Sequence, residues 1–493
     1  MHTNVLILTV CLSAVGAVGC NATDVLPEAP APAEERGPLG KADQAGSCEG
    51  HCGGKSAGHC WCDDWCEYYG DCCADKFPVC DEAGGQSTGT ESESGSSSDG
   101  DGTVAPTAVT QLAAGGQHTC ALLDNGAVRC WGDNAFGQLG YGHTDAVGDD
   151  ELPADAGDVE LGGVATQIAT ARRHSCALLD TGAVRCWGSG TAGRLGYGDT
   201  DSIGDDESPA VAGEVDVGEP VVRIAVGGEN TCAITTSGAL RCWGSTTYDG
   251  VPGTAGAGLD QPPSAAPAVD IGGAVDSVTM GDRHTCARLV TGTVRCFGTG
   301  LQGQHGQGVL GTIGDDEHPS QHGDVPLRYY QDVEQVSAGL NHTCVRYDSD
   351  TLHCWGVNWD RQCGYRSPEL IQNPQHVSAV NLDDNTPLVA AGGYHSCAIL
   401  DSGAVKCWGA NADGQLGAGH AQSSTGDPSA EAPVALLGVP IALSAGFSHT
   451  CALLEDGAVQ CWGRGVEGQL GLGTTENIGD DEAADAGGTV EVF

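Results

Sequence analysis

The sequence predicts an all-β repeat protein, and three observations support this prediction. Two cysteines separated by nine residues, followed by Trp-Gly or Phe-Gly, occur seven times in the 493 residues. The first cysteines of successive pairs are 53–58 residues apart, and a fixed period of this size is typical of propellers and solenoids. The chain also has 78 glycines and few aromatic residues, which is typical of turn-rich β proteins.

Each cysteine pair encloses a predicted β-hairpin. In the first repeat, short apolar stretches at residues 121–123 and 127–128 flank Asp124-Asn125-Gly126. This pattern is typical of a three-residue loop with glycine in the left-handed conformation. Five other repeats also place glycine there, whereas the fifth repeat has Asp350, a residue type that tolerates this conformation better than most.

The hairpins predict a disulfide in every repeat. A loop of odd length places the two cysteines opposite each other, where Cα atoms are about 4.5–5.5 Å apart, and a disulfide needs roughly 4.4–6.8 Å. The expected pairs are Cys120–Cys130, Cys176–Cys186, Cys232–Cys242, Cys286–Cys296, Cys344–Cys354, Cys397–Cys407 and Cys451–Cys461. Buried free thiols are the alternative, and an oxidising compartment favours the disulfides.

Charge and cysteine content restrict the partners and the compartment. The chain has 66 acidic residues against 20 Lys and Arg, a net charge of −46, so its surface repels nucleic acid. Of the 25 cysteines, fourteen belong to the hairpins and eight lie between Cys48 and Cys80, leaving Cys11, Cys20 and Cys363. Regularly spaced, paired cysteines indicate a location outside the cytosol.

The N-terminal region is predicted to direct export. Residues 5–18 form an apolar run that is too short to span a membrane and fits the core of a signal peptide, so we expect residues 1–19 to be removed. Residues 17–20, Ala-Val-Gly-Cys, resemble a bacterial lipoprotein box with Ala17 in place of the usual Leu, which implies lipidation of Cys20. Free secretion after ordinary cleavage is the alternative. Residues 20–46, rich in Ala, Pro and acidic residues, are expected to be a disordered tether.

Residues 47–81 are predicted to form a small disulfide-rich domain, because eight cysteines lie within 33 residues. The adjacent Cys72 and Cys73 argue against a zinc site. The cysteine spacing, with its Cys-x-Cys-Asp-x-x-Cys and Asp-Cys-Cys-x-Asp signatures, resembles the somatomedin B domain of vitronectin and related extracellular proteins.

That resemblance implies both a disulfide pattern and a binding site. The implied pairs are Cys48–Cys62, Cys52–Cys80, Cys60–Cys73 and Cys66–Cys72, whereas the sequence alone allows 105 arrangements. The implied partner-binding residues are Asp63, Trp65, Tyr68 and Tyr69, with Trp65 in place of the family's Leu and no Arg-Gly-Asp motif after Cys80. Exposed aromatic residues make good interface anchors, although capping of the disulfide core is an equal alternative.

Residues 82–106 are a predicted flexible Ser/Gly/acidic linker, and residues 107–493 contain the seven repeats. Gly-Gln-Leu-Gly elements follow the hairpins at residues 137–140, 414–417 and 468–471, with variants at 193–196 and 303–306. Together with His-Ser/Thr before each hairpin and Trp-Gly after it, this pattern resembles the regulator of chromosome condensation repeat, which implies a seven-bladed β-propeller.

Further strands are expected around the hairpins. Residues 164–170 and 158–161 fit two additional strands of a blade. Residues 488–493 are expected to pair with strands of the N-terminal repeat and thereby close the ring, which protects the sheet edges.

Six repeats carry a histidine before the first cysteine, which suggests a metal ring at first sight. These are His118, His174, His284, His342, His395 and His449, with Asn230 in the third repeat. Equivalent positions on neighbouring sheets are about 10 Å apart, whereas Zn–N bonds are about 2 Å long. We therefore expect structural histidines and no metal.

Four repeats carry a Gly-Asp-Asp-Glu loop whose carboxylates could bind Ca²⁺. The acidic triplets are Asp149-Asp150-Glu151, Asp205-Asp206-Glu207, Asp315-Asp316-Glu317 and Asp480-Asp481-Glu482. The spacing is not the helix-loop-helix calcium motif, because Ile203 stands where a ligand oxygen is required. Solvated turn acids are therefore the favoured interpretation.

Cys363 replaces Leu in the Gly-Gln-Leu-Gly element of the fifth repeat. It is predicted to be a buried free thiol, with intermolecular pairing as the alternative.

The functional prediction is an exported, monomeric protein-interaction module without catalysis or a cofactor of its own. It would sit on the outer membrane or cell surface, contact the membrane only through its lipid anchor, and bind a protein partner through a propeller face and the small domain. One alternative is a secreted inhibitor or hydrolase that acts through a propeller face. Another, implied by the family resemblance alone, is nucleotide exchange on a small GTPase, which the export signal and the acidity oppose.

Overall fold

The computed structural model describes residues 106–493, apart from 246–249, 251–256 and 328–331. These residues belong to a compact unit, Asp101–Phe493. The predicted signal peptide, the lipidation site Cys20, the tether and the small domain with Asp63, Trp65, Tyr68 and Tyr69 lie outside the described residues. They stay predictions.

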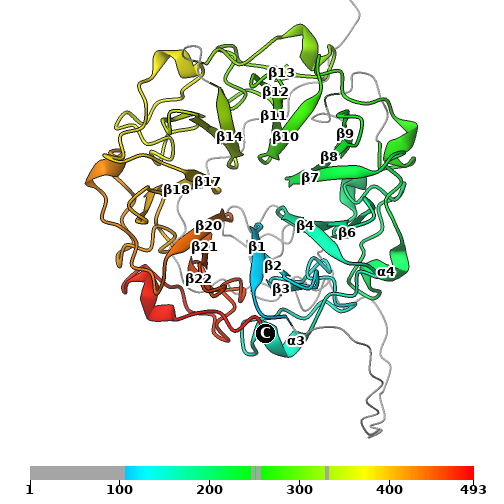
Figure 1. The fold of residues 1–493 in the computed structure, drawn as a ribbon, viewed down its shortest axis with the longest axis horizontal. Coiled ribbons are helices and arrows are strands. Elements are labelled where there is room, and N and C mark those ends of the chain that lie inside the picture. The colour runs from blue at the N-terminus through cyan, green and yellow to red at the C-terminus, as the bar shows by residue number, and fades with distance from the viewer. Residues whose placement is uncertain (1–105, 246–249, 251–256, 328–331) are drawn as a thin grey trace, which may run out of the picture. The chain divides into compact units, whose positions relative to one another are not determined.

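Seven antiparallel sheets surround a common centre, which confirms the predicted all-β propeller (Figure 1). Each sheet comes from one repeat. The strands are β1 (Val109–Ala114), β2 (His118–Leu123), β3 (Val128–Gly132); β4 (Ala165–Thr170), β5 (His174–Leu179), β6 (Val184–Gly188); β7 (Val221–Gly227), β8 (Asn230–Thr235), β9 (Leu240–Gly244); β10 (Val275–Met280), β11 (His284–Leu289), β12 (Val294–Thr299), β13 (Thr312–Ile313); β14 (Val333–Ala338), β15 (His342–Tyr347), β16 (Leu352–Gly356); β17 (Leu388–Ala391), β18 (His395–Ile399), β19 (Val405–Gly409); β20 (Pro440–Ala445), β21 (His449–Leu454) and β22 (Val459–Gly463).

Helical structure in the described residues is limited to single turns between strands. They are α3 (Pro153–Ala156), α4 (Pro209–Ala212) and 3₁₀ turns at Thr191–Gly193, Pro263–Ala265, Pro319–Gln321, Pro374–His376, Pro428–Ala430 and Ala484–Gly487. No helix in this part of the chain is long and apolar enough to cross a membrane.

The hairpin between the second and third strand of each sheet has the predicted geometry. Gly126 has a φ of 81°, and its N–H donates to the carbonyl of Leu123 at 2.9 Å. Asp350, the residue in place of glycine, adopts a φ of 57°. The predicted left-handed conformation is therefore confirmed both for a loop with glycine and for the loop with aspartate.

This hairpin register places the two cysteines of each repeat directly opposite each other. Cys120 pairs with Cys130 across β2 and β3, and the same register recurs in all seven sheets. The structure joins each pair as a disulfide with Cα atoms 4.0–4.1 Å apart. Each crosslink therefore connects two adjacent strands of one blade and leaves neighbouring blades to be joined by packing.

The hydrophobic core lies between neighbouring sheets. Val294 of β12, for example, packs with Val333 and Trp355 of the next repeat. The Trp after the second cysteine is buried in this seam, and its indole N–H donates to a backbone carbonyl of the preceding repeat, as from Trp187 to Gln138 at 2.9 Å. The same contact joins Trp131 to Gln469, Trp355 to Gln304, Trp408 to Gln362 and Trp462 to Gln415.

Two strand predictions were wrong. Residues 158–161 form no strand: Val159 N–H donates to the Val128 carbonyl at 2.8 Å, and the Glu160 carbonyl accepts from Ala210 N–H at 3.0 Å. The C-terminal segment forms no β-bridge with the first sheet, because Val490 bridges Val459 of β22, in its own repeat. It still contacts the first repeat, since Arg129 of β3 donates to the Val492 carbonyl at 2.7 Å and Ala154 N–H donates to the Glu491 carbonyl at 3.1 Å. Each repeat supplies all three or four strands of its own sheet, so ring closure needs no shared strand, and Trp131 donates to the Gln469 carbonyl as the equivalent Trp residues do between other blades.

Candidate interaction face

The loops between the first and second strand of every sheet meet at one end of the ring. Backbone hydrogen bonds join them: Gly116 N–H donates to the Ala171 carbonyl at 2.9 Å, and Phe447 N–H donates to Gly115 at 3.1 Å. Equivalent bonds run from Gly228 to Gly281, Asp282 to Leu340, Leu340 to Gly392 and Gly393 to Gly446. These bonds fix the loops relative to one another.

The close approach of these loops explains the glycine at their start. A Cβ atom on Gly115 would lie 2.4 Å from the carbonyl oxygen of Ala171 and 2.7 Å from Cε1 of His118. Sequence and fold therefore agree that this position admits only the smallest residues.

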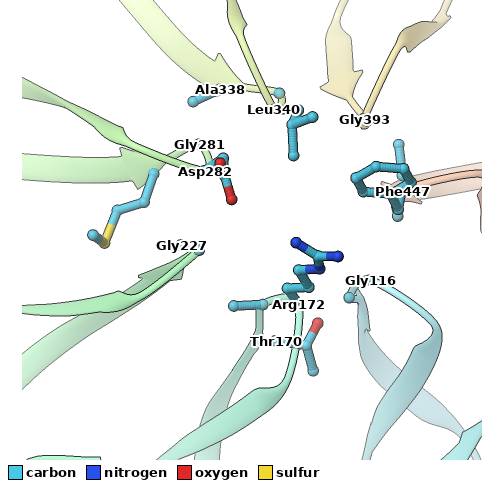
Figure 2. A pocket seen from close by; sticks show the side chains of 18 of the residues that line it. Gly116, Thr170, Arg172, Gly227, Gly281, Asp282, Ala338, Leu340, Gly393 and Phe447 are labelled. Carbon is cyan, nitrogen blue, oxygen red and sulfur yellow. The ribbon is translucent and has the colours of Figure 1, made fainter. Parts of the chain in front are cut away.

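The next position in these loops varies from repeat to repeat, and its side chains surround a central opening of about 150 Å³. The residues are Gly116, Arg172, Gly228, Asp282, Leu340, Gly393 and Phe447. Figure 2 shows Arg172 and Asp282 extending toward the centre from different blades, with Leu340 and Phe447 on the remaining sides. The opening thus combines one cation, one anion and two apolar side chains.

The two charged groups of the opening differ in their partners. Nε of Arg283 lies 3.4 Å from Oδ2 of Asp282. Burial raises the pKa of Asp282, while Arg283 and Arg172 lower it. Arg172 is exposed and forms no ion pair within 4.0 Å with any residue that the structure describes. Its guanidinium group is therefore available to a ligand.

Further arginines lie around Arg172. The guanidinium group of Arg173 lies 4.5 Å from the centroid of the Phe136 ring, a favourable cation–π arrangement. Arg194 is buried, which lowers its pKa, and lies 3.9 Å from Glu229. With Arg283, four of the 20 Lys and Arg residues of this acidic chain gather on one face. Asp282 and Glu229 lie beside these arginines, so charges of both signs are mixed around the opening.

An apolar sector occupies the part of this face formed by the fifth to seventh repeats. The rings of Tyr394 and Phe447 meet edge to face, with centroids 5.5 Å apart. Trp359 is 54% exposed, whereas the six other Trp residues of the described chain are fully buried. Val357 N–H donates to the Asn341 carbonyl at 2.9 Å, which ties the Trp359 loop to the loop that carries Leu340.

Backbone strain accompanies the exposed tryptophan. Arg361, two residues after Trp359, has a φ of 67° at a position where most other repeats have glycine, such as Gly137. A non-glycine residue in this conformation is strained, and such residues concentrate at functional sites. The strain therefore marks the Trp359 loop as a candidate for binding.

The six histidines before the first cysteines each contact the next repeat, which fits the structural role expected from the sequence. Nε2 of each lies near a hydroxyl of the next repeat, as for His118 and Ser175 Oγ at 2.8 Å. The same contact joins His174 to Thr231, His284 to Thr343, His342 to Ser396, His395 to Thr450 and His449 to Thr119 at 2.8–3.0 Å. Asn230 instead donates to the Ser245 carbonyl at 2.9 Å.

The four acidic loops pack on the preceding repeat, as shown by Gly142 N–H donating to the Gly204 carbonyl at 3.0 Å. In each triplet, one ligand atom per residue lies within 4.8 Å of the others. Burial, together with the neighbouring Asp150 or Asp206, raises the pKa of Glu151 and of Glu207 to about 7. Calcium binding at these loops stays a prediction.

Cys363 is a buried free thiol in the structure. Its Sγ donates to the Val357 carbonyl at 3.2 Å, and burial raises its pKa well above the ordinary value. A thiol in this environment is unreactive.

The residues of the central opening were missed by the sequence reasoning. The signal was present in the repeats themselves: Arg172, Asp282, Leu340 and Phe447 all occupy the second position before His, where three repeats have glycine. Divergence at one position of an otherwise uniform repeat could have identified them.

Comparison with known proteins identifies the repeat. The sequence profile of the regulator of chromosome condensation (RCC1) repeat matches residues 109–138, 165–194, 221–249, 275–307, 333–364, 388–415 and 441–469. The chain carries seven RCC1 repeats. Among its relatives, the ultraviolet-B receptor UVR8 of Arabidopsis thaliana is 28% identical over 372 residues, which cover 75% of this chain and 80% of the relative.

Two further relatives are similar over most of their own length. The secretion-regulating guanine nucleotide exchange factor of Mus musculus is 27% identical over 368 residues, 71% of this chain and 76% of the relative. The regulator of chromosome condensation of Xenopus laevis is 26% identical over 375 residues, with 72% and 84% coverage.

Solved structures share the fold of this RCC1-repeat protein. Yeast RCC1 (Prp20), solved bound to Kap60, superposes with a TM-score of 0.59 at 18% identity over 81% of this chain and 91% of its own. Human WBSCR16 superposes with a TM-score of 0.57 at 18% identity over 72% of this chain and 92% of its own. At this identity the likeness shows the fold alone.

Proposed function

We propose that this RCC1-repeat protein is an exported, surface-anchored module that binds a protein partner through the face around the central opening. One observation carries the proposal: exposed or half-exposed Arg172, Leu340, Trp359 and Phe447 lie on one face whose loops are held together by backbone hydrogen bonds. Tryptophan, arginine and other aromatic residues on a rigid scaffold are the usual anchors of protein interfaces.

The relatives support a protein as the partner. Yeast RCC1 (Prp20) has been solved bound to Kap60. Its crystal structure has also been described together with its binding properties to Gsp1p and histones. The net charge of −46 disfavours nucleic acid as the partner of the present chain.

Export is supported by the N-terminal apolar run and by the cysteine pairs. Residues 5–18 fit a signal peptide, and seven disulfides within single blades require an oxidising compartment. A lipid on Cys20 would anchor the protein, and the small domain with Asp63, Trp65, Tyr68 and Tyr69 would add a second binding site. The flexible linker would let both sites bind one partner with increased avidity.

The test is crosslinking of intact cells that carry the tagged full-length protein, followed by mass spectrometry of the crosslinked products. The double variant Arg172→Gln/Trp359→Ala is compared with Arg223→Gln/Leu437→Ala. Arg223 is exposed at the opposite end of β7, and Leu437 matches Trp359 with 54% exposure near the start of β20. A protein crosslinked to the wild type and the control variant, but not to the double variant, is expected. No specific product, or equal products for both variants, would refute the proposal.

Nucleotide exchange is the second candidate, because an exchange factor is among the relatives. It predicts accelerated release of labelled GDP from a small GTPase by the purified chain. We expect no acceleration, since export would separate the protein from cytosolic GTPases. A secreted inhibitor that acts through the same face would be a special case of the main proposal.

A further inference from the structure

We infer that the central opening binds an extended peptide segment of the partner in which a carboxylate side chain lies beside an apolar side chain. This inference rests on the proposed function, because it names the chemistry that the interaction face would recognise.

Arg172 supplies the site for the carboxylate. Its guanidinium group extends toward the centre of the opening (Figure 2) and has no ion pair with described residues. The backbone N–H of Arg172 is also without a hydrogen-bond partner in the described part of the chain, whereas the equivalent N–H groups of six other repeats donate to their neighbours. An arginine fork and an adjacent amide are well suited to a carboxylate, which accepts up to four hydrogen bonds.

Asp282 forms its ion pair with Arg283 at 3.4 Å and none with Arg172, so it leaves the hydrogen-bond donors of Arg172 open to a ligand. Its carboxylate faces the opening and can accept a hydrogen bond from the peptide N–H next to the bound carboxylate. The nearby Arg173, Arg194 and Arg283 further offset the repulsion between Asp282 and an incoming anion. The local field therefore admits a single carboxylate.

The apolar sector supplies the site for the neighbouring side chain. Leu340 and Phe447 form the sides of the opening away from Arg172 and Thr170 (Figure 2). Tyr394 packs edge to face on Phe447 at 5.5 Å and so fixes its ring. A peptide that leaves the opening over the fifth repeat would reach Trp359. The lining residues come from the loops of all seven repeats, so an extended segment can lie across these loops with individual side chains in the opening.

The net charge of the chain restricts the overall charge of the partner. A surface with a net charge of −46 repels an acidic protein at long range, so the carboxylate must be local and the partner neutral or basic overall. A basic partner would associate faster at low than at high ionic strength.

The test uses the full-length protein with disulfides intact and a positional-scanning library of fluorescent, C-terminally amidated hexapeptides. We expect Asp or Glu at one position to be preferred over Asn or Gln by about tenfold, with Leu, Phe or Trp preferred beside it. Arg172→Gln should abolish the preference for the acid and keep that for the apolar residue, whereas Leu340→Ala should do the reverse. Arg223→Gln, which removes the same charge at the other end of β7, should change neither preference.

Two results would overturn the inference: no acidic preference, or an acidic preference that persists in Arg172→Gln. Unchanged thiol counts and circular dichroism establish that the variants are folded. If the library gives no acidic preference but the cellular crosslink still depends on Arg172 and Trp359, the proposed function stands and only this inference fails.

Discussion

Nε2 of His118 lies 2.8 Å from the hydroxyl of Ser175 in the next repeat, and that hydroxyl donates to the carbonyl of Gln138 at 3.0 Å. The hydroxyl therefore accepts a hydrogen bond from the Nε2–H group, so the neutral histidine carries its proton on Nε2. Nδ1 of His118 is buried and has no hydrogen-bond partner among the described residues. Protonation of this ring would place a charge in a seam between two blades.

The first prediction follows from this arrangement. Burial lowers the pKa of His118, His284, His342 and His449 from 6.5 to about 3. Because the folded-state pKa lies below the unfolded one, stability is present above pH 6.5 and is lost as the pH falls toward 3. At pH 5 each of these histidines would lower the free energy of unfolding by about 2 kcal/mol relative to its value above pH 6.5. Guanidinium unfolding should show a steep loss of stability between pH 6.5 and 4.

His342→Asn tests the cause of this loss, because Asn230 shows that the fold accepts asparagine at the equivalent position. The variant should lose less stability than the wild type on acidification. An identical pH dependence would contradict the assignment to the histidines.

The second prediction concerns the indole hydrogen bonds between blades. Trp187 donates to Gln138 at 2.9 Å, whereas Nε1 of Trp243 is buried without a partner among described residues. Phe297 shows that phenylalanine fits this position. Trp187→Phe should therefore cost about 1 kcal/mol more in unfolding free energy than Trp243→Phe. If chemical denaturation gives equal losses of unfolding free energy for the two variants, the indole hydrogen bond does not stabilise the fold.

The third prediction concerns the disulfides. Each closes a short loop with a sequence separation of 10, so its loss should cost roughly 2–3 kcal/mol. The double variant Cys176→Ser/Cys186→Ser should have a lower melting temperature than the wild type under non-reducing conditions, and dithiothreitol should lower that of the wild type further. Cys363→Ser serves as the control for thiol chemistry and should leave the response to dithiothreitol unchanged. A wild type insensitive to reductant would argue against the disulfides.

The fourth prediction concerns the acidic loops. The folded-state pKa of Glu207 is raised from 4.5 to about 7, so its contribution to stability is fully present below pH 4.5 and is lost as the pH rises toward 7. Glu207→Gln should therefore flatten the pH dependence of the melting temperature over this interval. Because solvated turn acids are the favoured interpretation, EDTA at pH 8 should leave the melting temperature unchanged. A decrease with EDTA that Ca²⁺ reverses would instead establish a calcium site.

The sequence predicted the elements that repeat. The cysteine spacing recurs in every blade, and the hairpin glycine and the Trp-Gly pair recur in six of the seven. They recur because the blades share one local geometry. Gly126 and Asp350 show this directly, since both adopt the left-handed conformation that the pattern predicts.

The central opening could not be predicted in the same way. Arg172, Asp282, Leu340 and Phe447 are separated by 58–110 residues between successive members, and only closure of the ring brings them together. The error at Val490 has a related cause: the apolar pattern showed that the last segment extends along a strand, but it could not show whether β22 or the first sheet is its partner.

The measurement that most directly tests the account is the intact mass and free-thiol count of the protein from its native cell envelope. If the protein is exported and disulfide-bonded, we expect the loss of residues 1–19 and a lipid on Cys20. We also expect one titratable thiol, Cys363, and eleven disulfides formed by the other 22 cysteines that remain. An uncleaved chain with more than twenty free thiols would contradict export, and nucleotide exchange would then become the leading candidate.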